Sequence, residues 1–197
     1  ETKREIKRIG KFEKVSYEQF EKDYIDCFKE TFCEDCKDPN CEDLIEAIKE
    51  MARETYDNIK LPKRATSGSA GFDFYMPFDL TLHAGKTARI PSGIRCYMED
   101  GYVLNIYPRS GLGFKYRFAL DNTVGIIDSD YFYASNEGHI MMKMTNNTLK
   151  NKSVVLCQGE GFAQGLFNEF FITYDDNATD VRTGGFGSTT KKKKKVL

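Results

Sequence analysis

Hydrophobic and polar residues alternate along much of the chain from Gly71 onward. The alternation is clearest in residues 72–76, 80–84 and 140–145, where every second side chain is apolar. A period of two is typical of a β-strand with one buried face. Turn residues separate these runs roughly every ten residues, namely Gly85, Pro91–Gly93, Asp100–Gly101 and Asn146–Asn147. The pattern predicts a mainly β fold, an antiparallel sandwich or barrel.

Residues 16–57 follow a helical period instead. Ser16 and Gln19 have the spacing of a capping box. Two apolar stripes follow at helical spacing. The first consists of Phe20, Tyr24, Cys27, Phe28 and Phe32, and the second of Leu44, Ile45, Ile48, Met51 and Ala52. A Lys37-Asp38-Pro39 turn separates them, and Asn40 can cap the second helix. The segment predicts a helical hairpin. Before Ser16 the apolar residues recur every three positions, and no strand is assigned there.

Charge divides the chain at the same boundaries. Residues 16–57 hold fourteen Asp or Glu and five Lys or Arg, a net of −9, whereas the whole chain has a net charge of −1. The remainder therefore carries +8, which favours an anionic ligand on the β body. The simpler interpretation is two solvated surfaces of opposite sign. No apolar run is long enough for a membrane span.

The chain contains six cysteines and no secretory signal, which predicts a reducing, cytoplasmic environment. Cys27, Cys33, Cys36 and Cys41 have the spacing C-x5-C-x2-C-x4-C and could bind zinc. Packing is the favoured interpretation, because Cys27 lies on the apolar helix face and free cysteine is commonly buried.

Five short stretches carry the candidate chemistry, in this order: SAGFDF (69–74), PRSGLG (108–113), NTVGIIDSDY (122–131), GFAQGLF (161–167) and RTGGFGST (182–189). Together they resemble the five motifs of the trimeric dUTPases, over roughly residues 58–190. The resemblance implies a jelly-roll-like β-barrel, hydrolysis of dUTP to dUMP and pyrophosphate, and a homotrimer whose subunits share active sites.

The resemblance assigns the catalytic base to Asp128, which would activate water for attack on the α-phosphorus. On spacing alone, an Asp at this position would indicate an Asx-turn. Asp73 matches the first-motif carboxylate that supports the base. Asn122 matches the residue that binds the uracil edge, and the hairpin through Gly125 would offer backbone groups to the same base. Tyr131 resembles the residue packed under the deoxyribose, where a 2′-hydroxyl would clash.

Arg109, Ser110 and Gly111 supply a guanidinium, a hydroxyl and an amide suited to the α- and β-phosphates. Gln164 matches the polar residue of the fourth motif that helps to hold them. The sequence shows no cluster of hard metal ligands, so Mg²⁺ is expected to arrive on the triphosphate oxygens rather than on protein ligands.

The C-terminal segment, residues 176–197, is expected to act as a flexible lid that reaches a neighbouring subunit. Arg182, Gly187 and Ser188 would meet the phosphates, and Phe186 would stack on uracil. The five lysines that follow are interpreted as a solvated tail. The resulting division places the β domain at residues 1–15 and 58–175 and the acidic hairpin at 16–57.

The chain departs from the family pattern at three places. Six residues separate Tyr131 from Gly138, five more than usual, the tail motif is one residue shorter, and the acidic hairpin is extra. Two alternatives stay open: a dCTP deaminase-like enzyme of the same fold, and a nucleotide-sensing regulatory protein that binds a partner through the hairpin. Docking of the hairpin on the β body is the favoured interpretation. Neither nucleic acid nor membrane is expected as a partner.

Overall fold

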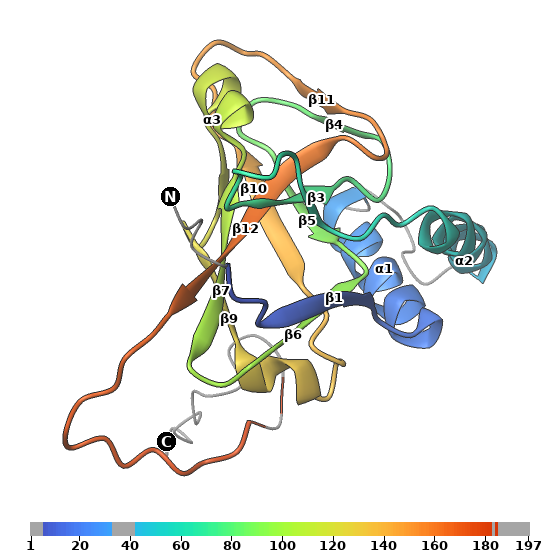
Figure 1. The fold of residues 1–197 in the computed structure, drawn as a ribbon. Helices are drawn as coiled ribbons and strands as arrows, with labels where there is room; N and C mark the ends of the chain where they lie inside the picture. The colour runs from blue at the N-terminus through green and yellow to red at the C-terminus, as the bar shows by residue number, and fades with distance from the viewer. Residues whose placement is uncertain (1–5, 33–41, 183, 185–197) are drawn as a thin grey trace, which may run out of the picture.

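The computed structural model describes residues 6–32, 42–182 and 184. Most of its regular structure from residue 63 onward is antiparallel strand (Figure 1). The strands are β1 (Gly10–Lys14), β2 (Lys63–Arg64), β3 (Phe72–Tyr75), β4 (Leu80–Leu82), β5 (Thr87–Pro91), β6 (Ile94–Met98), β7 (Tyr102–Pro108), β8 (Phe118–Leu120), β9 (Gly125–Asp128), β10 (Met141–Asn146), β11 (Val154–Leu156) and β12 (Gly161–Glu169). The helices are α1 (Tyr17–Phe32), α2 (Glu42–Asp57), α3 (Ser110–Tyr116) and the short 3₁₀ helix η1 (Ser129–Tyr133). None of the helices in the described ranges is long and apolar enough to cross a membrane.

The largest sheet has the strand order β2-β3-β12-β7-β9. Its long strand β12 pairs with β7 from Ala163↔Pro108 to Glu169↔Tyr102, and on its other side with β3. Three smaller ladders complete the β body: β5-β10-β8, β1-β6 and β4-β11. The expected mainly β, antiparallel fold is confirmed, although the described strands form separate ladders rather than one closed barrel.

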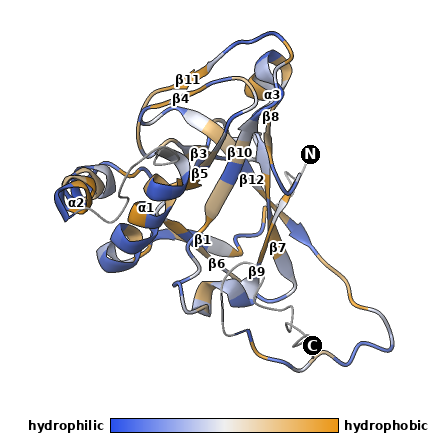
Figure 2. Ribbon diagram, turned by 180° about the vertical axis from the view of Figure 1, so that it is seen from behind, coloured by the Kyte–Doolittle hydropathy of each residue, from blue (hydrophilic) through white to orange (hydrophobic). Residues whose placement is uncertain are grey.

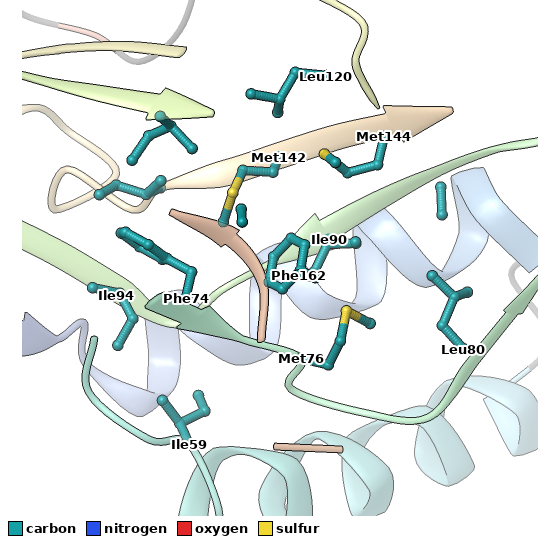
Figure 3. Packing of buried hydrophobic residues seen from close by; sticks show 14 of the residues in the cluster. Ile59, Phe74, Met76, Leu80, Ile90, Ile94, Leu120, Met142, Met144 and Phe162 are labelled. Atoms are coloured by element: carbon teal, nitrogen blue, oxygen red, sulfur yellow. The ribbon is translucent and has the colours of Figure 1, made fainter. Parts of the chain in front are cut away.

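Strand β10 shows how the alternating pattern builds the core. Met142 and Met144 are buried, whereas Lys143 between them is exposed. Figure 3 shows both methionines pointing toward the same interior as Phe74 of β3 and Phe162 of β12. Side chains from two separate sheets therefore close one hydrophobic core.

Strand β1 was missed by the pattern of apolar residues. Gly10–Lys14 pairs with β6, and the Phe12 ring lies 5.3–5.8 Å from those of Phe72, Phe74 and Phe167. Ile6, which suggested a period of three, lies before the strand and is 74% exposed. The spacing of three misled because β1 is short and only one of its residues, Phe12, packs strongly.

Helices α1 and α2 lie where the hairpin was predicted, with α1 between α2 and the strands (Figures 1 and 2). Phe20 and Tyr24 of α1 and Ile48 and Ala52 of α2 are buried and belong to the core that the strands share. The apolar faces of the hairpin are therefore used in docking on the β body, as the simpler interpretation predicted.

The predicted capping box is only half correct. The Ser16 hydroxyl accepts a hydrogen bond from the Gln19 N–H at 3.2 Å, as an N-cap does. The reciprocal partner is not Gln19, whose side chain donates to Asp23. It is Glu137, a residue of the long loop after η1, which accepts from the Ser16 N–H at 2.7 Å and from its hydroxyl at 2.6 Å.

Cys27 is a packed thiol on the buried side of α1. Burial raises its pKa to about 12, so the free thiol is protonated near neutral pH. The other three members of the proposed cluster, Cys33, Cys36 and Cys41, lie outside the described residues, as does Asn40. In the described ranges no group of three or more His, Cys, Asp or Glu could hold a metal ion.

Gly138 lets the long loop return onto η1. Its φ is +70°, and a Cβ there would lie 2.6 Å from the Tyr131 carbonyl oxygen and 2.8 Å from the Phe132 Cα. Gly101 has a similar φ of +85° but open space around the Cβ position. The two glycines share the conformational requirement, and only Gly138 also has the close backbone contact.

We expect Gly138→Ala to destabilise the protein more than Gly101→Ala. Both substitutions place a side chain in the left-handed region at a cost of roughly 1 kcal/mol. Gly138→Ala must in addition displace backbone, which adds about 1–3 kcal/mol. Thermal unfolding of both variants measures the difference, and equal melting temperatures would contradict the close packing of this loop on η1.

Candidate active site

One group of predicted site residues gathers where β7 ends and α3 begins. Arg109 follows β7, and its Nε lies 3.4 Å from Oδ1 of Asp73 in β3. Gln164 of β12 pairs with both Asp73 and Tyr107 in the sheet, and its side-chain amide donates to the Pro108 carbonyl at 3.4 Å. The sheet register therefore brings the first, second and fourth motifs together, and we call this group the arginine cluster.

Glycine makes room for the arginine cluster at two positions. A Cβ on Gly161 would lie 2.5 Å from Nη1 of Arg109, and one on Gly71 would lie 2.7 Å from Oε1 of Gln164. Ser110 and Gly111 come next in the chain and are exposed beside Arg109. A cation, a hydroxyl and a backbone N–H thus share one open surface, which suits an anion with several oxygens.

A second group lies where β9 ends. Asp128 is the last residue of β9, and Asp130 and Tyr131 belong to η1, which follows directly. Arg182 reaches this group from the C-terminal segment. Its Nη2 pairs with Asp128, its Nε lies 2.8 Å from Asp130, and its guanidinium carbon lies 5.7 Å from the centre of the Tyr131 ring. We call this group the aspartate cluster.

The environment of Asp128 favours proton acceptance. Burial raises the pKa of this carboxyl above its ordinary value, the Arg182 guanidinium opposes the shift, and the Asp130 carboxylate adds to it. A carboxylate whose pKa is raised is a stronger base than an ordinary surface aspartate. Its side chain remains 48% exposed, so water can reach it.

Asn122 lies on the turn between β8 and β9, and Gly125 is the first residue of β9. Asn122 is exposed and lines an open cavity of about 410 Å³, which is also lined by Glu30, Arg89, Asp121, Met141 and Lys143. Gly125 is buried against Ile106, and a Cβ on it would lie 3.1 Å from the Ile106 Cβ. This hairpin therefore keeps its backbone close to β7 without an intervening side chain.

Tyr131 is held by the loop that follows η1. It lies in η1 and is buried, and its hydroxyl donates to the His139 carbonyl oxygen at 2.8 Å. The amide of Asn136 donates to the Tyr131 oxygen at 2.9 Å. Sequence reasoning missed both partners, although they lie in the loop whose extra length it noted.

The arginine and aspartate clusters lie at opposite ends of β7. Asp128 pairs with Val103 near the start of that strand, and Arg109 follows its end, six residues further on. An extended chain rises about 3.3 Å per residue, so the two positions are roughly 20 Å apart. Figure 1 shows this separation, with α3 at the top of the molecule and the gold η1 segment at the bottom. Within one protomer Asp73 therefore contacts Arg109 and not Asp128.

Only part of the predicted tail site can be placed. Arg182 lies against the aspartate cluster, whereas Phe186, Gly187, Ser188 and the lysine run lie outside the described residues.

Comparisons with known proteins agree with these motifs. Residues 57–190 match the family model of dUTPase. The chain is 41% identical over 134 residues to the deoxyuridine 5′-triphosphate nucleotidohydrolase of Lactococcus lactis subsp. lactis (strain IL1403), which covers 66% of this chain and 88% of that relative. The enzyme of the same name from Paraburkholderia phytofirmans is 41% identical over 140 residues, with 67% and 90% covered.

The similarity extends to three dimensions. The crystal structure of dUTPase from Streptococcus mutans matches with a TM-score of 0.53 and 39% sequence identity, over 59% of this chain and 90% of that one. The region matched by the family model begins at residue 57, where α2 ends, so nearly all of the helical hairpin lies outside it. With more than half of its residues matched by the family model, this chain belongs to the dUTPase family.

Proposed function

We propose that this chain hydrolyses dUTP to dUMP and pyrophosphate, with Asp128 as the base that activates water for attack on the α-phosphorus. The observation that carries the assignment is the environment of Asp128: a partly buried carboxylate with a raised pKa, open to water, in the third motif of a dUTPase-family chain. The attack needs such a base because phosphate oxygens repel the incoming water.

The arginine cluster is the proposed phosphate site. Arg109, Ser110 and Gly111 offer donors to the α- and β-phosphates, and Gln164 adds an amide from the neighbouring strand. Asp73 lies 3.4 Å from Arg109, so it holds the guanidinium while phosphate is absent. Donors fixed in advance in this way stabilise the negative charge that develops as the bond to the leaving pyrophosphate breaks.

The β8–β9 hairpin and η1 are the proposed base and sugar sites. Asn122 and the backbone around Gly125 would pair with the uracil edge, so cytosine would leave buried donors or acceptors unpaired. Tyr131 would pack under the deoxyribose and exclude a 2′-hydroxyl. The dCTP deaminase alternative has no observation in its favour here, since the matched family and named relatives are dUTPases.

The distance between the two clusters supports a homotrimer with shared sites. About 20 Å separates Asp128 from Arg109 along β7, which is too far for one protomer to assemble the reaction. The arm after β12 supports the same proposal, because Phe171 and Ile172 are 90% and 71% exposed. Figure 2 shows hydrophobic positions along this arm, which runs apart from the sheets. Contact with another copy of the chain would bury them.

Magnesium is the proposed cofactor, carried by the substrate. Mg²⁺ dehydrates reluctantly and commonly binds through substrate phosphates and waters, so the ion is proposed to be held mainly by triphosphate oxygens. The ion would neutralise phosphate charge. The protein's own contribution there is the set of donors around Arg109.

A cytoplasmic location is also proposed, and it rests on the cysteines of the described residues. Cys27, Cys96 and Cys157 are free thiols, as expected in a reducing compartment.

We expect Asp128→Asn to retain the fold and nucleotide binding while kcat for dUTP falls by about 10³-fold or more, because an amide can orient water but cannot accept its proton. Release of pyrophosphate from dUTP measures the loss, and binding of a non-hydrolysable dUTP analogue serves as the control. An unchanged kcat would remove Asp128 from the reaction.

Mixing two inactive variants tests the shared site. Asp128→Asn lacks the base, and Arg109→Ala lacks the phosphate donor, so each homotrimer is expected to be inactive. When the two variants are mixed in equal amounts and exchange subunits at random, about half of the sites receive an intact Asp128 and about half of those an intact Arg109. The mixture should therefore regain about a quarter of the wild-type activity if base and donor come from different subunits. No recovery after confirmed subunit exchange would show that each protomer carries a complete site.

The C-terminal lid is tested by truncation. Deletion of residues 182–197 is expected to leave assembly and melting temperature unchanged while kcat falls by about 10²-fold, as for the loss of one set of charge-stabilising donors. Restoring residues 182–190 should recover most of the activity, which would identify the lysine run as dispensable. Full activity of the truncated protein would refute the lid.

A further inference from the structure

The helical hairpin and the long loop after η1 are the two large additions to the family pattern, and they bind each other. His139, at the end of the loop, is completely buried, and Asp23 of α1 is 8% exposed. The His139 Nδ1–H donates to Oδ2 of Asp23 at 2.6 Å. This buried contact fixes the end of the loop against the added hairpin.

Both ring nitrogens of His139 are engaged, which fixes the side chain. The Gly93 N–H donates to Nε2 at 2.8 Å, so Nε2 carries no proton and the ring is the neutral Nδ1–H form. Burial by itself raises the pKa of Asp23, but hydrogen bonds from His139 and from the Gln19 amide outweigh it, and the pKa lies below its ordinary value. The carboxylate is therefore charged and satisfied, as a buried charge must be.

The backbone of the same histidine holds Tyr131. The tyrosine hydroxyl donates to the His139 carbonyl oxygen at 2.8 Å and accepts from the Asn136 amide at 2.9 Å. Gly138 lies against the backbone of Tyr131, as its close contact with the carbonyl oxygen shows. The position of the phenol ring therefore depends on where residues 136–139 lie.

A second contact ties the same loop to the start of α1. Glu137 accepts hydrogen bonds from the N–H and the hydroxyl of Ser16, at 2.7 and 2.6 Å. The loop is thus held by α1 on either side of Gly138, at Glu137 and at His139. A loop of this length without such contacts would have many conformations available.

We infer that Asp23 and His139 are positioning residues for Tyr131, and that the helical hairpin acts through them on the choice between deoxyribose and ribose. The inference rests on the proposed role of Tyr131 under the sugar. Asp23 fixes the His139 ring, the fixed residue presents its carbonyl to the Tyr131 hydroxyl, and the held phenol ring excludes a 2′-hydroxyl. The hairpin thereby takes part in substrate selection through the position of Tyr131.

If Asp23 and His139 only stabilised the fold, the expected result would differ from that of a positioning role. Loss of stability alone would lower the melting temperature and change the turnover of dUTP and UTP by the same factor. A positioning role changes the ratio of kcat/KM for dUTP to that for UTP. The experiment therefore measures this ratio in the full-length protein, with pyrophosphate release as the assay for both nucleotides.

The variants are Asp23→Ala, Asp23→Asn, Tyr131→Phe and the double variant Asp23→Ala/Tyr131→Phe. Asp26→Ala, an exposed position on the same helix, is the control. Asp23→Ala and Tyr131→Phe should each lower the ratio about tenfold, and the double variant should lower it no further than about twofold beyond Tyr131→Phe alone. Asp23→Asn keeps an acceptor for Nδ1–H and should retain most of the ratio, and Asp26→Ala should retain all of it.

Two results would overturn the inference. One is an unchanged ratio in Asp23→Ala, and the other is a double variant whose loss is the product of the single losses. An unchanged ratio in Tyr131→Phe would show that the bond from the Tyr131 hydroxyl to the His139 carbonyl does not govern the choice of sugar, and would overturn the inference, while hydrolysis of dUTP by all variants would still support the proposed activity. If Asp23→Ala does not fold, Glu137→Ala removes the other tie and should lower the ratio about threefold.

Discussion

The pairing of β12 with β7 is the interaction on which the rest of the structure depends. It runs along the full length of β7, from Tyr102 to Pro108, and β3 and β9 attach on either side of this pair. Every motif residue of the β body is placed relative to these strands. Gln164 and Asp73 pair with each other in the sheet, beside the end of β7 that Arg109 follows. Asp128 lies far from them because it pairs with Val103, near the start of β7.

The rigid spacing of an extended strand then imposes a constraint on the chemistry. An extended strand has a fixed length, so its two ends stay apart. One protomer therefore presents the proposed phosphate site at one end of β7 and the candidate base at the other. In the proposed mechanism, a complete reaction centre would combine complementary ends from different copies of the chain. The exposed apolar residues after β12 fit such an arrangement, since they have no buried environment within the described protomer.

The hairpin illustrates a second kind of dependence. Its apolar stripes explain why α1 and α2 dock, but hydrophobic contact alone leaves sliding and rotation open. The buried pair of Asp23 and His139 and the bonds between Ser16 and Glu137 are directional, so they define one docked position. Breaking such a pair is costly because one partner would remain buried and unsatisfied. This directionality is what would allow a peripheral helix to influence Tyr131, as we propose.

The sequence by itself determined the fold class, the two helices and the residues of the candidate site. Alternation of apolar residues marked strands such as β10, and five motifs in a fixed order identified the family and pointed to Asp128, Arg109 and Gln164. These features are local, because each depends on a few neighbouring residues and their periodicity.

The tertiary structure alone decided which of these residues meet. The replacement of Gln19 by Glu137 as the partner of Ser16, the bond from Asp23 to His139, and the separation of Asp128 from Arg109 join or divide positions far apart in the chain. No local pattern encodes them, because they follow from strand register and from the packing of the hairpin on the core. Long-range polar contacts of this kind arise only when the whole fold brings their partners together.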